Sequence, residues 1–335
     1  MPLAYLTKRL LMAVPTLFGV AIVVFVLLRV VPGDPIAMMI PPGAREADIG
    51  RLRALYGLDQ PILVQFGHWL ADVASGKFGS SISLRQPVVG LILSRLPATL
   101  ELALAAMMLA TAVGILLGVA ATFWRGRWPE AAVDGFAGLA MAIPDFLWGL
   151  MFVLALGVLL PVLPISGRID PRLETNFATG FYLLESVLRG EFRVTASLLS
   201  HLVLPMVALA LPLTAAVARV LKSALKEAMA QDYVLMARAR GFSPWRIIWR
   251  EAFRNALVPT VTLSGVQFAF LLGGTVLIER IFSYPGIGNL AIGAVIDRDL
   301  PLIQAVVLTF AVLFIALNLV IDMTYALLNP RIRHG

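Results

Sequence analysis

Six long apolar runs divide this sequence, and they constrain its fold more than any other feature. A helix needs about 20 apolar residues to cross the hydrocarbon core of a bilayer. Hydrophobic residues make up 59% of the 335 residues and charged residues only 14%, against about 25% charged residues in soluble domains. The sequence therefore predicts an all-α membrane protein with six transmembrane helices. The runs are Leu10–Val31, Pro97–Phe123, Gly135–Leu160, Leu202–Ala218, Ala256–Ile278 and Leu302–Ile321.

The first run predicts a retained helix rather than a cleaved signal. Leu10–Val31 is longer than the apolar core of a secretory signal, and no small-residue cleavage pattern follows it. An even number of spans places both termini on one side of the membrane. Lysine and arginine are almost equally numerous on the two sides, but they are denser, with fewer acids, on the side of the termini and the short loops. We therefore expect both termini and the segment Lys222–Asn255 to be cytoplasmic.

The segment Lys222–Asn255 is basic, strongly patterned and placed between two apolar runs. Gly241 suits the left-handed conformation that ends a helix, Ser243 is a good N-cap, and Pro244 fits the first position of the next helix. The segment therefore predicts two short amphipathic helices with a hinge. The predicted apolar stripes are Leu225, Met229, Tyr233, Met236 and Ala237 in the first helix, and Trp245, Ile248, Trp249, Ala252, Phe253 and Ala256 in the second, beside a row of Arg246, Arg250 and Arg254.

Two interpretations of this segment are open from its residues alone. Two amphipathic helices at the mouth of a membrane domain can hold a partner. They can equally be an interfacial linker whose arginines lie among lipid headgroups. The net charge of +7 suits a membrane surface better than nucleic acid, because no basic tract is interleaved with stacking aromatic residues.

On the opposite side, the segment Pro32–Leu96 is too long to be a simple connector. Its helical stripes predict a small extracytoplasmic helical cap, and a second outer segment, Pro161–His201, is polar. Such segments can seal a pathway, receive a partner, or only pack against each other. The predicted organisation is an N-terminus and first helix over 1–31, a cap over 32–96 and a five-helix core over 97–335. The cap stripes are Leu52, Leu55 and Tyr56, and Ile62, Phe66, Trp69 and Leu70.

Two acidic residues within the apolar runs are candidate functional groups, because charge in hydrocarbon is costly. Asp145 follows Pro144, where a proline break frees backbone groups. It either lines a translocation path or serves the break structurally. Glu101 lies near the start of its run, where we expect a favourable charge at a helix N-terminus or a partner for a nearby arginine.

Several chemistries are missing from the sequence. It has no phosphate-binding G-x-x-x-x-G-K-[ST] loop, no H-E-x-x-H and no G-x-S-x-G, and it contains no cysteine. No nucleophile and base form a convincing pair. A proton-driven secondary transporter would carry its protons on Asp145 or Glu101, yet it would usually show broken helices in two matching halves. Only one proline-broken span beside an acid is evident.

Different short motifs are spread along nearly the whole chain, and any one of them alone is weak evidence for a protein family. They are Lys8-Arg9-Leu10-Leu11, Pro15-Thr16-Leu17-Phe18-Gly19, Val31-Pro32-Gly33-Asp34-Pro35, Leu58-Asp59-Gln60-Pro61, the stretch from Arg95 to Leu102, Gln231-Asp232-Tyr233, the stretch from Ala237 to Gly241, the stretch from Arg254 to Pro259, the stretch from Phe282 to Gly288, Arg298-Asp299 and Asn329-Pro330-Arg331. In this order and spacing, the sequence resembles permease subunits of the peptide/nickel class of ATP-binding-cassette importers, in particular the dipeptide and oligopeptide permeases.

This resemblance implies a type I importer permease fold and transport of dipeptides or oligopeptides across the bacterial inner membrane. It makes Lys222–Asn255 the coupling loop that contacts the ATPase subunits. The general importer loop begins Glu-Ala-Ala, whereas Leu235-Met236-Ala237 stand here, so no role of that glutamate carries over. The residues that match the family's loop motif are Asp232, Tyr233, Ala237, Arg238, Gly241, Arg254 and Asn255, with Pro259.

The resemblance also implies the partners. These are a second, homologous permease in a heterodimer, two ATPase chains that bind ATP with magnesium, and an extracytoplasmic peptide-binding protein. The chain itself is then expected to be non-catalytic and to hold no cofactor. Selectivity in such systems lies mostly in the binding protein, so the substrate stays open between dipeptides, longer peptides, nickel chelates and other small solutes.

Overall fold

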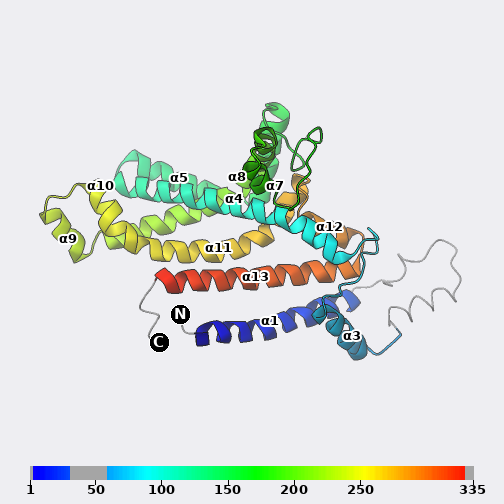
Figure 1. Ribbon diagram of the computed structural model, residues 1–335. Coiled ribbons are helices and arrows are strands. Elements are labelled where there is room, and N and C mark those ends of the chain that lie inside the picture. Colours follow the sequence, from blue (N-terminus) through cyan, green and yellow to red (C-terminus); the bar gives the residue numbers. More distant parts are fainter. Residues whose placement is uncertain (1–2, 31–58, 329–335) are drawn as a thin grey trace. The chain divides into compact units, whose positions relative to one another are not determined.

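The computed structural model describes residues 3–30 and 59–328, and these are almost entirely helical (Figure 1). Among the described residues, the only β-pairing is an isolated bridge between Ser80 and Pro87. The chain groups into two compact units, one made of Pro97–Gly288 with the described residues from Ala316, the other of the described residues up to Leu96 with Asn289–Ile315. The motifs around Val31 and Asn329 and the predicted stripe of Leu52, Leu55 and Tyr56 lie outside the described residues.

Long apolar helices confirm the expected membrane class. In the described residues, four are long and apolar enough to cross a bilayer, and a bent helix pair makes a fifth if it counts as one span. The first helix, α1 (Leu3–Val30), contributes a described apolar stretch of Leu11–Val26, which is shorter than this limit. The four long spans are Val88–Phe123, Phe192–Ala228, Pro244–Ile281 and Leu300–Ile321.

In the unit that contains the N-terminal helix, α3 (Ile62–Ala74) packs against α1 through aromatic rings. The ring of Phe66 lies 5.1 Å from that of Phe25 and 6.0 Å from that of Phe18, and Trp69 lies 5.4 Å from Phe25. Phe66 and Trp69 of the predicted stripe thus face α1, whereas Ile62 at its start is 59% exposed. The same unit contains a buried carboxylate, Asp299, which accepts hydrogen bonds from Ser81 and Ser83.

In the other unit, α8 (Phe192–Ala228) is the central helix. It packs against α5 (Trp128–Ala142), α6 (Asp145–Phe152), α7 (Tyr182–Leu188) and α11 (Phe253–Ile281), and the long helices lie side by side in Figure 1. Small residues allow this closeness, as Ala137, Ala140 and Ala215 form the contact between α5 and α8. Small side chains are favoured where membrane helices approach, because dispersion contacts rather than water exclusion hold them together.

The helix α4 (Val88–Phe123) lies against α8 at two glycines. A Cβ atom added to Gly114 would lie 2.7 Å from the Cβ of Val217, and one added to Gly118 would lie 3.0 Å from the carbonyl oxygen of Ala218. Gly114 and Gly118 are four residues apart and share one helix face. The two backbones therefore approach as closely as glycine permits.

The apolar run Gly135–Leu160 is broken at the proline, as the sequence predicted. The chain forms α5, a break at Ile143 and Pro144, and then α6 with the π-helix η1 (Val153–Leu159), with a bend of 98° between the two halves. Pro144 explains the break, because its ring has no N–H to donate and disfavours a helical residue before it. Ile143 is accordingly extended, with φ −102° and ψ 124°.

Candidate functional site

The patterned segment after α8 folds into a short helix, a turn and a second helix. The pieces are α9 (Asp232–Ala239), α10 (Pro244–Arg246) and the π-helix η2 (Ile247–Ala252), which continues into α11. In Figure 1, α9 lies beyond the ends of the long helices. The predicted first helix is therefore wrong in extent, because α8 ends at Ala228 and the chain restarts as a separate helix at Asp232.

The turn at Gly241 has the predicted local chemistry. Gly241 takes φ 75°, its N–H donates to the carbonyl of Arg238 at 2.9 Å, and Phe242 donates to the carbonyl of Ala237 at 3.2 Å. This pair of bonds is a Schellman ending, which satisfies carbonyls that the helix leaves free. Ser243 then accepts from the N–H of Arg246 at 3.4 Å, and Pro244 begins the next helix. The predicted stop and start signals are confirmed.

Buried apolar contacts fix α9 against the following helix. Val234, Ala237 and Ile247 are buried together, with Met229 and Phe242 packed against them. Tyr233 and Met236, which the predicted stripe placed on the apolar face, are exposed instead. The break after Ala228 shifts the helical register, so Val234 takes the buried position.

The outward face of α9 combines apolar and charged groups. Leu235 and Met236 are 62% and 61% exposed, whereas Val234 and Ala237 of the same helix are buried. Asp232 and Arg238 are also exposed on this helix. A mixed face of this kind can enter a groove on another protein.

A side-chain hydrogen bond joins the two halves of the segment. The amide of Asn255 donates to the hydroxyl of Tyr233 at 2.9 Å. It connects α11, a membrane span, with α9, which projects from it. The structure thus brings together Tyr233 and Asn255, two residues that were predicted for one site, while Arg254 is exposed nearby in sequence.

The second predicted stripe is largely confirmed. Ile248, Ala252 and Ala256 are buried against Val119 of α4 and Leu221 and Leu225 of α8, with Trp249 and Phe253 beside them. Trp245 departs from the prediction, since it is 55% exposed. Trp245 lies before η2 at the start of the helix, where its ring meets Phe123 at the end of α4 and Trp249.

Lys222, at the start of the segment, ties α8 to α5. Its ammonium group contacts Glu130 and Asp134 at 2.7 Å each. Glu130 also accepts from the N–H of Gly126 at 2.6 Å, so the same pair orders the turn before α5. The base of the segment is thereby fixed to a neighbouring span.

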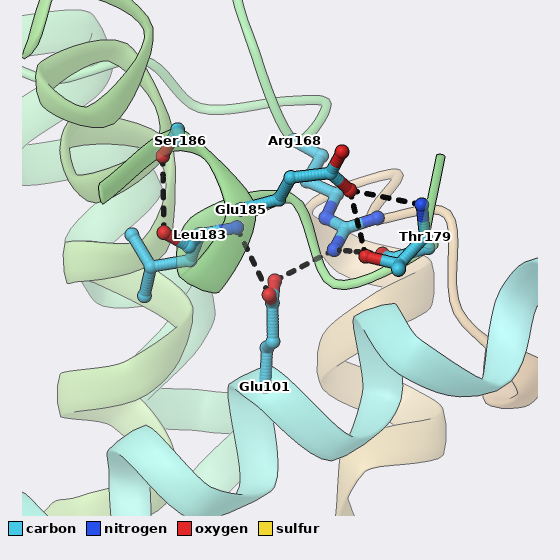
Figure 2. Close-up of polar contacts among 7 residues, drawn as sticks. Glu101, Arg168, Thr179, Leu183, Glu185 and Ser186 are labelled. Carbon is cyan, nitrogen blue, oxygen red and sulfur yellow. Dashed lines mark hydrogen bonds and ion pairs between the residues drawn. The ribbon is translucent and has the colours of Figure 1, made fainter. Parts of the chain in front are cut away.

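Glu101 belongs to a buried ion pair, which Figure 2 shows. Its carboxylate lies 2.6 Å from the guanidinium of Arg168, and the two side chains are only 9% and 6% exposed. Arg168 also donates to the carbonyl of Gly180 at 2.8 Å and stacks on the ring of Tyr182 at 4.1 Å. Two roles were predicted for Glu101. Its pairing with an arginine is confirmed, but it does not lie at a helix N-terminus, because α4 begins at Val88.

A second carboxylate in Figure 2, Glu185, orders the loop before α7. It accepts from the N–H groups of Ala178 at 2.9 Å and Thr179 at 2.8 Å, from the Thr179 hydroxyl, and from Arg189. Burial by itself would raise the pKa of Glu185, but these hydrogen bonds and the charge of Arg189 outweigh it and lower the pKa to about 2. The carboxylate is therefore ionised at neutral pH.

Asp145 is the first residue of α6, directly after the break. Its carboxylate accepts from the N–H of Phe146 at 2.7 Å, and a Cβ added to Gly274 of α11 would lie 3.0 Å from it. A carboxylate at this position meets the free N–H groups of a helix N-terminus. This placement fits the structural role that was one of the two predicted alternatives.

Sequence reasoning missed the buried charged residues Arg168, Glu185 and Glu279, and it placed Asp299 only within a motif. Glu279 lies in the last turn of α11 and faces the turn Phe282–Gly288, where a Cβ on Gly286 would overlap its carboxylate. The signal for it was the Phe282–Gly288 motif, whose glycines are needed because the chain folds back onto Glu279. In the described residues, no group of three or more His, Cys, Asp or Glu side chains could hold a metal ion.

Comparison with known families gives two matches. The family described as "Binding-protein-dependent transport system inner membrane component" matches residues 110–334, and the family describing the N-terminal part of such membrane components matches residues 2–103. The candidate segment around Gly241 lies within the first match.

Curated relatives match over nearly the full length. The chain is 40% identical over 335 residues to the di/tripeptide transport system permease protein DppB of Pseudomonas aeruginosa, covering 99% of both chains. It is 36% identical to the dipeptide transport system permease protein DppB of Escherichia coli K12, again covering 99% of both. The glutathione transport system permease protein GsiC of Salmonella choleraesuis is also 36% identical, with 99% of both covered.

Among solved structures, an inward-facing form of the MetNI methionine ABC transporter matches with a TM-score of 0.55 at 16% identity. The match covers 72% of this chain and 98% of that one. At this identity the likeness concerns the fold, which agrees with the predicted type I importer permease architecture.

Proposed function

The chain belongs to the family of inner membrane components of binding-protein-dependent transport systems, and we propose that it forms part of the translocation pathway of an importer for dipeptides or oligopeptides. It is a multi-pass, non-catalytic permease subunit of an ATP-binding-cassette importer. The names of its relatives, which transport dipeptides, tripeptides or glutathione, support short peptides as substrates. ATP hydrolysis in such systems belongs to partner ATPases.

Within this function, we propose that Lys222–Asn255 is the coupling loop. The observation that carries the proposal is the exposed face of α9, with Asp232, Leu235, Met236 and Arg238, held on a helix that is fixed from behind by Val234 and Ala237. A rigid helix seated in a groove of an ATPase transmits the movement of that subunit to the attached spans. The hydrogen bond from Asn255 to Tyr233 carries this movement from α9 into α11.

The assembly that follows has one further permease, which pairs with this chain as a heterodimer, two ATPases that bind ATP with magnesium, and an extracytoplasmic binding protein. Both termini and α9 face the cytoplasm in this arrangement. The ion pair of Glu101 with Arg168 then lies on the outer side, where it fixes the segment before α7 to α4.

Affinity purification of the tagged chain from its own host in mild detergent tests this function. We expect a second permease and ATPases to purify with the wild type. The variant Arg238→Glu should lose the ATPases and keep the second permease, whereas Arg193→Glu, which changes an exposed arginine at the start of α8, should keep both. Uptake of a labelled dipeptide by the reconstituted complex with binding protein and ATP should fall in parallel.

Two results would contradict the proposal. Recovery of the chain alone, with uptake that needs no nucleotide, would exclude the importer function and direct attention to Asp145 as an ion-coupling group. Unchanged ATPase attachment in Arg238→Glu would leave the importer function in place and remove α9 as its coupling element.

A further inference from the structure

An aromatic cluster joins the ends of two membrane spans. The ring of Phe123, the last residue of α4, lies 5.7 Å from that of Trp245 in α10 and 5.5 Å from that of Trp124. Trp245 in turn lies 5.6 Å from Trp249, which lies 4.7 Å from Phe253. The cluster therefore connects the last turn of one span with the first turns of another.

The outer members of this cluster are exposed rather than buried. Trp124 is 40% and Trp245 55% exposed, and Trp128, which begins α5, is 81% exposed. Exposed tryptophan at the end of a spanning helix is typical of the membrane interface, where the indole ring lies at the depth of the lipid headgroups. Phe123 ends the apolar run of α4, so the rings that touch it share that depth.

Positive charge surrounds these rings. Arg125 and Arg127 follow Trp124 in the turn between α4 and α5, and Arg246 and Arg250 follow Trp245 and Trp249, and all four arginines are exposed. Arg246 lies over the ring of Phe242 at 3.9 Å, which orients its guanidinium. Guanidinium groups bind phosphate through paired hydrogen bonds.

Nearby acids do not cancel this charge. Lys222 contacts both Glu130 and Asp134 at 2.7 Å, so this group offsets only one of the four arginine charges. Glu251, in η2, is partly buried. The patch made of Trp124, Arg125, Arg127, Trp245, Arg246 and Arg250 therefore combines stacking surface at headgroup depth with net positive charge.

We infer that this patch is a binding site for an anionic phospholipid. Its arginines take the phosphate and its tryptophan rings lie along the glycerol region and the upper acyl chains. The site is separate from the exposed face of α9, which lies beyond the ends of the spans (Figure 1). The inference rests on the membrane location of the chain and does not need the coupling role of α9.

Native mass spectrometry of the full-length chain in detergent tests the site. The protein is mixed with equal amounts of phosphatidylglycerol and phosphatidylcholine, and retained lipid is counted. We expect phosphatidylglycerol to be retained preferentially. In the paired variant Arg125→Gln with Arg246→Gln, the ratio of retained phosphatidylglycerol to retained phosphatidylcholine should fall by about fivefold for each arginine removed.

The matched control is Arg172→Gln with Arg193→Gln. Both arginines are exposed, and Arg172 lies in the loop that meets the opposite end of α11, where Gly167 donates to the carbonyl of Phe282 at 2.9 Å. This control should retain phosphatidylglycerol as the wild type does. Equal elution profiles in size-exclusion chromatography would show that both paired variants are folded.

Three outcomes would overturn the inference. Equal retention of the two lipids by the wild type would exclude a site for anionic lipid. Displacement of phosphatidylglycerol by soluble glycerol 3-phosphate would identify a small-anion site instead. Loss of copurifying ATPases from Arg125→Gln with Arg246→Gln, with lipid preference intact, would assign the patch to a protein contact.

Discussion

The hydroxyl of Thr99 in α4 donates a 2.7 Å hydrogen bond to the carboxylate of Glu279 in α11, a residue that is completely buried. The same hydroxyl accepts from the N–H of Ile287 at 2.8 Å. One threonine thus joins α4, the end of α11 and the turn that follows it. Glycines at 286 and 288 leave the space that the carboxylate fills.

The first prediction concerns that space. Gly286→Ala would drive a methyl group into the carboxylate of Glu279, so we expect a loss of about 1–3 kcal/mol in the free energy of unfolding, as for overpacked cores. Gly138→Ala in α5 is the control, since nothing lies within 4 Å of its added Cβ. Thermal unfolding in detergent should show a lower midpoint for Gly286→Ala alone. Equal midpoints in the two variants would show that the turn Phe282–Gly288 can move away from the carboxylate of Glu279 and accept the added methyl group.

The buried ion pair gives a second prediction. Arg168→Met leaves the carboxylate of Glu101 buried without its cation, and breaking such a pair costs about 3–5 kcal/mol. Arg172→Met, an exposed change in the same segment, should alter stability by less than about 0.5 kcal/mol. Adding Glu101→Gln to Arg168→Met should recover part of the loss in a double-mutant cycle by denaturant unfolding. Additive single effects would argue against a direct pair.

A pH dependence follows from Glu185. Its pKa falls from the ordinary 4.5 to about 2 in the folded protein, so its ionised form stabilises the loop fully above about pH 4.5 and this stabilisation is lost as pH falls through about 2. Hydrogen exchange at Ala178 and Thr179, corrected for intrinsic rates, should accelerate over this window. In Glu185→Gln the exchange should be faster at neutral pH and should not change further on acidification. An unchanged profile in this variant would assign the dependence to another group.

The turn at Gly241 predicts a difference between two substitutions. Valine at φ 75° is strained by about 1–2 kcal/mol, whereas asparagine tolerates this region. Gly241→Val should therefore lower the equilibrium ratio of molecules with the Schellman ending of α9 to those without it by about 5- to 30-fold, and peptide uptake should fall with it. Gly241→Asn should keep uptake near wild type. Membrane insertion and expression should be equal in both. Equal uptake by the two variants would show that the turn geometry does not matter for transport.

The contact between Asn255 and Tyr233 supplies a further prediction. Tyr233→Phe removes a neutral hydrogen bond, which is worth about 0.5–1.5 kcal/mol at most positions. We expect a small stability loss and a larger loss of uptake per ATP hydrolysed, because the tie between α9 and α11 is broken. Asn255→Ala in the Tyr233→Phe background should add little. A second, independent loss would show that the two residues act separately.

The local signals in the sequence predicted local structure well. Gly241 and Ser243 act through hydrogen bonds to residues three positions away and Pro244 through its own fixed φ, so their roles follow from order alone. The helical stripes were less secure. A break of three residues after Ala228 changed the register, so Tyr233 moved out of the predicted apolar face, and Trp245, at the start of its helix, is exposed.

The partners of the buried polar residues in the unit that contains Pro97–Gly288 could not be predicted from the sequence. Thr99 and Glu279 are 180 residues apart, and Glu101 and Arg168 are 67 apart. Nothing in the spacing of either residue indicates its partner, because the pairing depends on which spans lie together. The glycines of the motif Phe282–Gly288 indicated a close contact with the backbone, but they did not indicate that the side chain in contact is Glu279.

The glycine contacts of α4 with α8 set a limit on how this subunit can deform. Sliding one helix along the other by a residue would place a side chain where only 2.7 Å separates the Gly114 position from Val217. This close contact opposes sliding, so we expect α4 and α8 to move together. We expect a cycle that opens and closes a pathway to pivot these two helices together, and the adjoining span to bend at its 98° corner at Ile143 and Pro144.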